Sequence, residues 1–425
     1  MGEIVSALVR DTPLPHMFCV RQRFPRPRID PKALPALVDA ELSRPDIAGR
    51  VRPGMRIALT AGSRGVANIA LILRQAAGFC QTRGALPFVV AAMGSHGGAT
   101  AEGQRKILEE YGVTEASVGC PVCTEMDVKQ IGRNEEGEPV FIDRRAAEAD
   151  GILVIGRVKP HTAFRGPYES GIMKMMVIGL GKQAGASLCH KEGFGQMAHR
   201  IPLFGRAILR QAPIIGALAI LENAYDETCQ LTALSTEEIE PREPVLLKQA
   251  FTYMPRILVD ACDVLVVDQI GKDYSGDGMD PNITGTFCTP YATGGIQSQR
   301  VAVLDVSDAS HGNAMGVGFA SATTQRLYQK IDMDAMYPNA ITATVLGGVR
   351  IPVVMPNDRE CIQLCVRTCT GIDHSAPRIV HIPNSLHLEY IQLSAAYGPA
   401  LETIPGLEIA DGPLPFAFDP QGNLF

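Results

Sequence analysis

Short apolar runs alternate with longer amphipathic stretches along most of the chain. Apolar runs are typical of strands buried on both faces of a parallel sheet, and amphipathic stretches predict the helices that cover it. In the first half, strands are predicted within residues 55–62, 85–98, 149–162 and 214–223, and helices within 64–84 and 100–112. Thr100 is in place to cap the second of these helices. The pattern predicts an α/β fold with mostly parallel sheets.

A second series of the same kind follows a charged, proline-containing stretch at residues 238–258, which predicts a connecting helix. A chain of 425 residues also exceeds what one hydrophobic core normally serves. We therefore expect two α/β domains, residues 1–260 and 261–405, with a tail, 406–425, that can return to the first. Sites in such proteins often lie between domains, so we expect an interdomain active-site cleft.

Composition narrows the classes of function. A net charge of -6 argues against nucleic acid and anionic membrane as partners, because both require basic surface. No apolar run reaches the length of a membrane span and the N-terminus lacks the features of a signal peptide, so a cytoplasmic location is expected. The 11 cysteines are then free thiols. We interpret both the Cys120/Cys123 pair and the Cys361, Cys365 and Cys369 series as structural.

Three loops that follow predicted strands carry reactive side chains. Arg64 lies in "AGSRG", His96 in "MGSHGG" and His161 in "VKPHTAFRG". The carboxyl ends of parallel strands face one crevice, so the two imidazoles can converge on one ligand. Histidine titrates near neutral pH, which suits proton transfer. The alternative, two unrelated loop histidines, stays open at this point.

Lys174 stands between Met173 and Met175, where an ammonium group is costly to desolvate. It is either a lysine with a packed stem and a solvated head, or one used as a tether, Schiff-base former or anion clamp. His190 follows 16 residues later and suits a metal ligand. No second ligand stands at ligand spacing, so any metal here would need ligands from outside the protein.

The order and spacing of these residues resemble a known family. The residues in question are His96, His161, the stretch Ser170-Gly171-Ile172-Met173-Lys174 and His190, at intervals of 65, 13 and 16 residues. In this order they resemble the lactate racemase family of nickel-pincer enzymes, of which the chain would be a divergent member. The resemblance implies a racemase or epimerase of a small 2-hydroxy acid. It implies nickel and a pyridinium-3,5-bisthiocarboxylic acid mononucleotide, joined covalently to Lys174 and made by cofactor-synthesis enzymes.

The resemblance also implies a role for each residue. His190 would be the protein ligand of nickel, and Ser170, Gly171, Gly179 and Gly181 would lie along the nucleotide. His96 and His161 would be the acid/base pair, one removing the hydroxyl proton while the Cα hydrogen leaves as hydride to the cofactor. Hydride return to either face then racemises the substrate. Arg64 would hold the substrate carboxylate or developing charge.

The chain also departs from the family. Ala61 stands where the family has an aspartate, and Ile172 where it has a second glycine. The family's substrate-binding Gln and Lys in the second domain have no clear match. The corresponding loop offers Lys272, Asp273 and Asn282 as substrate-binding candidates. Its aspartates would accept hydrogen bonds from hydroxyls, which favours a sugar acid over lactate, unless they only cap the tight turns.

Two other functions remain open on the sequence alone. One is a redox relative, in which the same tethered nucleotide accepts hydride but the oxidised product leaves. The other is an anion- or nucleotide-binding protein that keeps the fold without the cofactor. The presence of His96, His161, Lys174 and His190 together favours an enzyme, because a binding protein has no need for that set.

Overall fold

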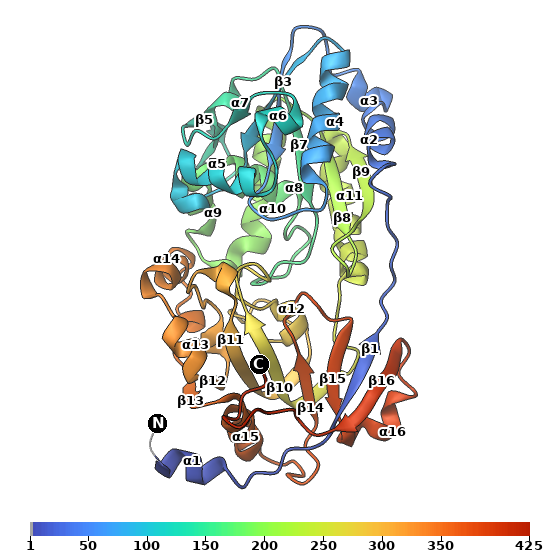
Figure 1. Cartoon of the computed structure of the whole chain (residues 1–425). Coiled ribbons are helices and arrows are strands. Elements are labelled where there is room, and N and C mark those ends of the chain that lie inside the picture. Colours follow the sequence, from blue (N-terminus) through green and yellow to red (C-terminus); the bar gives the residue numbers. More distant parts are fainter. Residues whose placement is uncertain (1–2) are drawn as a thin grey trace. The chain divides into compact units, whose positions relative to one another are not determined.

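The computed structural model describes residues 3–425, and the chain forms two compact units (Figure 1). The first unit is Pro25–Met254, and the second combines the segment up to Phe24 with Pro255–Phe425. The boundary expected near residue 260 therefore lies a few residues earlier. The expected assignment of the N-terminal segment to the first domain is wrong, because β1 (Met17–Gln22) pairs with two strands near the C-terminus.

The first unit is built on a six-stranded sheet of order β4-β3-β2-β7-β8-β9. All neighbours in it pair in parallel except the last pair, β8 and β9. The predicted α/β class is confirmed, and each of the four predicted strands is present, because their apolar runs are buried from both sides. The strands are β2 (Arg56–Ala61), β3 (Leu86–Ala91), β4 (Val122–Cys123), β7 (Gly151–Arg157), β8 (Ile214–Glu222) and β9 (Thr228–Leu234).

One face of this sheet is covered by helices from the N-terminal half of the unit. Leu34, Ile72 and Leu108 on three of these helices belong to one buried core with the strands. Thr100 caps the predicted helix that follows β3, since its side chain accepts a hydrogen bond from the backbone N–H of Gly103. The helices are α2 (Leu34–Leu42), α3 (Pro45–Ala48), α4 (Ile69–Thr82), α5 (Ala101–Glu110) and α6 (Glu115–Val118).

The other face is covered by a short helix that precedes β7, by the segments that follow β7 and by the predicted connecting helix. Met176, Phe204 and Leu246 come from three of these segments and share a second core. A small hairpin, β5 (Val128–Arg133) and β6 (Pro139–Asp143), adjoins them. The helical segments are α7 (Arg144–Ala147), α8 (Ile172–Lys174), a π-helix (Met175–Leu180), α9 (Lys182–His190), α10 (Met197–Gln211) and α11 (Thr236–Tyr253).

The second unit has an eight-stranded sheet of order β13-β12-β11-β10-β14-β15-β1-β16. The strands from β13 to β14 are parallel, and β15, β1 and β16 continue the sheet in antiparallel pairing. The strands are β10 (Ala261–Ile270), β11 (Gln297–Val306), β12 (Ala322–Thr324), β13 (Val353–Met355), β14 (Ile379–Ile382), β15 (Tyr390–Ser394) and β16 (Leu407–Leu414).

Helix α15 packs on one face of this sheet and explains the cysteine series. Cys361 and Cys365 are completely buried in the core beneath it, and Cys369 lies just after the helix in the same core. The interpretation of these cysteines as structural is confirmed. The helices of the second unit are α1 (Glu3–Val9), α12 (Pro281–Thr284), α13 (Gln325–Lys330), α14 (Met333–Ala343), α15 (Asp358–Thr368) and α16 (Gly398–Leu401).

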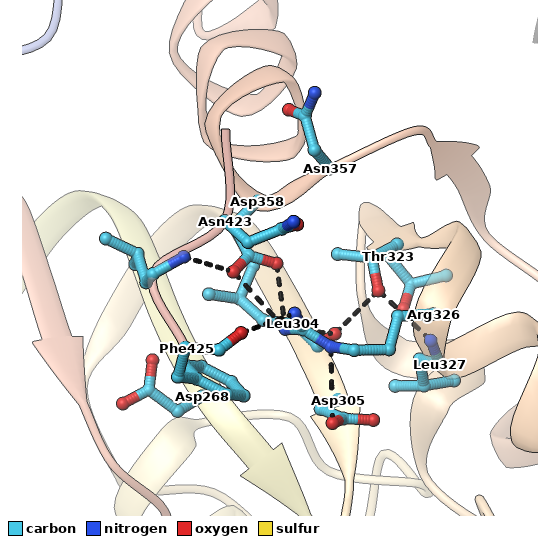
Figure 2. Close-up of polar contacts among 12 residues, drawn as sticks. Asp268, Leu304, Asp305, Thr323, Arg326, Leu327, Asn357, Asp358, Asn423 and Phe425 are labelled. Carbon is cyan, nitrogen blue, oxygen red and sulfur yellow. Dashed lines mark hydrogen bonds and ion pairs between the residues drawn. The ribbon is translucent and has the colours of Figure 1, made fainter. Parts of the chain in front are cut away.

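The C-terminal tail also belongs to the second unit, so the expectation that it returns to the first is wrong. Figure 2 shows Arg326 between the carboxylates of Asp305 and Asp358, with Phe425 beside them. Arg326 donates to the Phe425 carbonyl, and the backbone N–H of Leu424 donates to Asp358. Apolar tail side chains pack against the core under α15 at the same place. The tail is thus fixed by burial and by charge together.

Within residues 3–425, no helix combines the length and the apolar character that crossing a membrane requires.

Candidate functional site

The strand order of the first unit creates a switch point at its carboxyl edge. From β2 the chain proceeds to β3 and β4 on one side, and later to β7 and β8 on the other. Ligands of such sheets bind where the order reverses, beyond the carboxyl ends of the strands. Arg64, His96 and His161 follow β2, β3 and β7 in turn, so they extend from three adjacent strands.

The loops after β2 and β3 are joined by a side-chain hydrogen bond. Ser63 Oγ lies 2.6 Å from Nδ1 of His96. Arg64 and His96 are both exposed side chains. When His96 donates from Nδ1 to the serine, its Nε2 has the lone pair that a general base needs. The serine thus orients the ring of His96.

His161 is held by its own loop in a defined tautomer. Its Nδ1 accepts a hydrogen bond of 3.0 Å from the backbone N–H of Ala163, so the neutral ring carries its proton on Nε2. The backbone N–H of His161 donates to Glu169, and Arg165 donates to the His161 carbonyl, both at 2.7 Å. Glu169 is buried and accepts from the backbone of this loop twice.

Electrostatics keep His161 neutral. Burial lowers the pKa of this imidazole well below its ordinary value, and the positive charges of Lys174, His190 and Arg165 lower it further. A neutral ring with its proton on Nε2 is a hydrogen-bond donor at neutral pH. It can therefore donate a hydrogen bond from Nε2 to an oxygen of a ligand.

Lys174 is the last residue of α8 and is half-buried. The π-helix begins at the next residue, and such wide turns occur frequently at functional sites. The charge of Lys174 lowers the pKa of both His161 and His190, so the three groups lie within electrostatic reach of one another. The structure thus brings together three of the residues that the sequence singled out.

Glu243 of α11 supports the start of the Lys174 helix. It is completely buried, and its Oε2 accepts a hydrogen bond of 2.8 Å from the backbone N–H of Met173. Its Oε1 has no hydrogen-bond partner in the described part of the chain. Burial raises the pKa of Glu243 to about 8, although hydrogen bonds from the backbone oppose this. The helix carrying Lys174 is thus capped by a carboxyl group from a distant helix.

His190 ends α9, and its tautomer is the opposite of that of His161. Its Nδ1 lies 2.8 Å from the Ala186 carbonyl, which can only accept, so Nδ1 carries the proton and Nε2 has a lone pair. Burial lowers the pKa of His190, which favours the neutral ring. A ring anchored through one nitrogen with a lone pair on the other is the usual form of a metal-binding histidine.

Phe194 lies beside the half-buried imidazoles of His161 and His190. Its ring centroid is 5.6 Å from that of His190 and 6.2 Å from that of His161. The aromatic ring thus provides an apolar surface next to both histidines.

The donor set fits a metal that brings its own ligands. Among residues 3–425 no group of three or more His, Cys, Asp or Glu side chains could hold a metal ion. His190 offers one nitrogen lone pair, and the Lys174 amine lies near enough to affect its pKa. One imidazole lone pair beside a lysine amine is compatible with a bound group that supplies further metal donors itself.

The residues expected to lie along the nucleotide have roles within the protein. The backbone of Ser170 pairs with Lys159 and so joins the His161 loop to the start of α8. A methyl group at Gly171 would overlap the Glu243 carboxyl, one at Gly179 would meet the Ala92 carbonyl, and one at Gly181 would meet the Val177 carbonyl. Packing alone explains these three glycines, and contact with a nucleotide stays a prediction.

The candidate loop of the second unit follows β10, at the switch point between β10 and β14. Asp273 accepts hydrogen bonds from the hydroxyls of Ser307 and Ser310. Asp280 accepts from the backbone N–H of Asn282, and Lys272 donates to the Gly276 carbonyl. These bonds support the alternative in which the aspartates cap turns, and substrate binding by this loop stays a prediction.

Comparison with known proteins identifies the segment that carries these residues. Residues 67–200 match the family model of the lactate racemase N-terminal domain. This segment, about a third of the chain, is similar to that domain of lactate racemases. Among solved structures, the lactate racemase apoprotein from Thermoanaerobacterium thermosaccharolyticum is similar at 14% identity and a TM-score of 0.47, over 79% of this chain and 83% of that one. No curated protein sequence shows a significant match.

The matched segment contains His96, His161, Lys174 and His190, whereas Arg64 precedes it. Ser63, Glu169 and Phe194 were missed by the sequence reasoning. Ser63 and Glu169 had a signal, since each is a polar residue next to a predicted site residue, Arg64 and Ser170. Phe194 had none, because one aromatic residue in a glycine-rich stretch is ordinary.

Proposed function

We propose that this protein is a racemase or epimerase of a 2-hydroxy acid that uses a nickel-pincer nucleotide tethered to Lys174. The family supports a lactate racemase-like isomerase in general. The observation that carries the finer proposal is the pair of opposite tautomers around one lysine. His161 has its proton on Nε2 and His190 has a lone pair on Nε2, and both lie within reach of the Lys174 charge.

The residues divide the work by their chemistry. Lys174 would hold the nucleotide covalently, and His190 would bind its nickel through Nε2. When bound, this group supplies the hydride acceptor that a poorly acidic Cα–H requires. His96 accepts the hydroxyl proton at Nε2 while Ser63 orients its ring. His161 would donate a hydrogen bond from Nε2 to the same oxygen, and His96, protonated in the first step, would return its proton to that oxygen when the 2-oxo acid is reduced.

Arg64 and Phe194 complete this assignment. The exposed guanidinium of Arg64 binds the substrate carboxylate, for which its planar donors are suited. Phe194, whose ring lies beside both imidazoles, would shield a bound substrate from water. The planar 2-oxo acid can accept hydride on either face, which is the basis of racemisation.

Cofactor loading tests the proposal directly. We expect the intact mass of protein co-expressed with the cofactor-making enzymes to include an adduct, and Lys174→Ala to lose it. His190→Ala should keep the adduct and lose nickel, measured by metal analysis. Lys106→Ala, a change at an exposed lysine, is the matched control and should retain both. An adduct that persists in Lys174→Ala refutes the tether.

Substrate identity is tested with the loaded enzyme. We propose a 2-hydroxy acid as the substrate, and the carboxylates at residues 272–282 favour a sugar acid over lactate. Polarimetry and solvent proton exchange over a panel of 2-hydroxy acids will rank them. Fast turnover of lactate with none of sugar acids contradicts the preference for sugar acids. Net formation of free 2-oxo acid would instead favour the redox relative.

A further inference from the structure

Lys182 is a completely buried charged residue that the proposed mechanism does not use. It is the first residue of α9, and only Gly181 separates it from the π-helix. Its side chain is completely buried, and its backbone is left-handed, with φ of 52°. A buried ammonium group and a left-handed non-glycine residue are each costly, so surrounding contacts must stabilise this position.

The ammonium group of Lys182 has a partner for each of its three donors. Its Nζ lies 2.5 Å from the Ala91 carbonyl, 3.3 Å from Oε1 of Gln104 and 3.2 Å from Oδ2 of Asp143. Burial lowers the pKa of Lys182, and the charge of Asp143 opposes this. The three partners belong to β3, α5 and the end of β6, so one side chain joins three elements.

Gln104 continues this network to the His96 loop. Its side chain is completely buried, and its amide nitrogen donates to the carbonyls of Gly94, at 3.1 Å, and His96, at 3.2 Å. Both amide hydrogens are used, while the amide oxygen faces Lys182. Asp143, Lys182 and Gln104 thus form a continuous buried chain that ends on the backbone of His96.

The His96 loop needs such support. Gly97, Gly98 and Ala99 have φ values of 66°, 64° and 55°, a left-handed run that few sequences adopt without external contacts. The backbone N–H of Gly94 also donates to the carbonyl of Gly179 in the π-helix, at 3.2 Å. The loop is thus tied by backbone and by side chain to the segment between Lys174 and His190.

A purely stabilising role does not account for Lys182. A buried ion pair contributes little net stability, because the Coulombic gain scarcely exceeds the cost of desolvating two charges. Apolar side chains of the same volume would hold β3 and α9 together as well. They could not bond to the Gln104 amide oxygen, however. The amide nitrogen would then no longer be held in the orientation in which it donates to the carbonyls of Gly94 and His96.

We propose that Lys182 and Gln104 are positioning residues. They hold the His96 loop at a fixed position relative to the helices that carry Lys174 and His190. This inference rests on the proposed function only in assigning His96 to the reaction. Through this network the acid/base loop and the cofactor-binding helices move as one body. The position of the His96 imidazole is then already fixed in the folded protein before any cofactor is attached.

The test uses the full chain without cofactor. Lys182→Met removes the ammonium group and keeps most of its volume. The double variant Lys182→Met/Asp143→Asn also removes the charge left unpaired, while the asparagine oxygen can still cap α7, where Asp143 accepts from Ala146. Hydrogen exchange of residues 94–99 and ¹⁵N NMR of the His96 ring report on the loop, and thermal unfolding reports on stability.

We expect the double variant to recover stability lost in the single variant while the loop stays loose. Amide exchange at residues 94–99 should be about 10-fold faster in both, as for loss of one or two hydrogen bonds. The His96 nitrogen signals should move toward those of a free imidazole. Lys106→Met, an exposed lysine on α5, should change neither. Unchanged exchange and unchanged His96 signals in the double variant overturn the proposal.

Two further measurements separate this proposal from the proposed function. If Lys182→Met does not fold, Gln104→Met removes the donors to His96 with little change in volume and must show the same loose loop. In loaded enzyme, Lys182→Met should keep the adduct mass and nickel but lower kcat more than it raises KM. Absence of an adduct in the unmodified protein refutes the proposed function and leaves the result on the loop standing.

Discussion

Replacing Glu243 by Gln should change the pH dependence of stability more than the stability itself. Glutamine keeps the shape of the side chain and an oxygen that can accept the Met173 N–H. It cannot ionise. The buried Oε1 has no partner in the described chain, so the amide that replaces it loses no existing hydrogen bond. The variant therefore isolates the free energy of ionising one buried carboxyl group.

The sign follows from the raised pKa. Below the ordinary value of 4.5, Glu243 is protonated in folded and unfolded chains alike. Between 4.5 and about 8 the unfolded chain releases the proton while the folded chain keeps it, so the free energy of unfolding falls as pH rises. The two pKa values differ by about 3.5. At about 1.4 kcal/mol per pH unit, the loss reaches about 5 kcal/mol by pH 8.

The assay compares the two proteins at each pH, so that other titrating groups cancel. Trp is absent, and far-UV circular dichroism or calorimetry is therefore the suitable probe of unfolding. We expect the stability of Glu243→Gln relative to the unmodified protein to rise from pH 5 to pH 8 and to level off above. Infrared difference spectra at pH 7 should show a protonated carboxyl band that the variant lacks. A difference in stability that is constant from pH 5 to pH 8.5, with no such band, would refute the reasoning.

Three other predictions concern the same unit. Ser63→Ala should lower the kcat of loaded enzyme about 5-fold, the effect of one hydrogen bond of about 1 kcal/mol, and shift the His96 Nδ1 signal. Arg200→Met removes a fully buried guanidinium that pairs with two glutamates and should lower the free energy of unfolding by about 3 kcal/mol, measured by urea denaturation. Gly171→Ala should destabilise the protein by about 2 kcal/mol through overlap with Glu243, and its cost should fall when combined with Glu243→Ala; additive costs would contradict that contact.

The hydrophobic pattern was sufficient to predict the buried strands but not how they assemble. The runs that became β7 and β10 are largely apolar because most of their residues are buried. The partners of β1 could not be predicted. It pairs with β15 and β16, which lie at the other end of the chain, and β16 is mostly exposed and has no continuous apolar run. The assignment of both chain ends to the second unit follows from these long-range pairs alone.

The site was predictable where chemistry is concentrated in loops. His96 and His161 stand among glycines and prolines directly after apolar strands, and the parallel sheet fixes where those loops lie. The tautomers of His161 and His190 could not be predicted, because they depend on the backbone groups of Ala163 and Ala186. Those two hydrogen bonds decide which imidazole can donate a hydrogen bond from Nε2 and which has a lone pair there for a metal.

Supporting residues were missed because their environment, and not their type, gives them their role. A lysine in "GLGKQ" and a glutamate in "EPREP" look like solvated surface residues in sequence, and most such residues are. Lys182 and Glu243 are nevertheless completely buried, one bonded to β3 and the other to the start of α8. Each connects a loop or helix of the site to an element distant in sequence. Substitutions at these two positions should therefore alter the site while every residue expected to touch the substrate is unchanged.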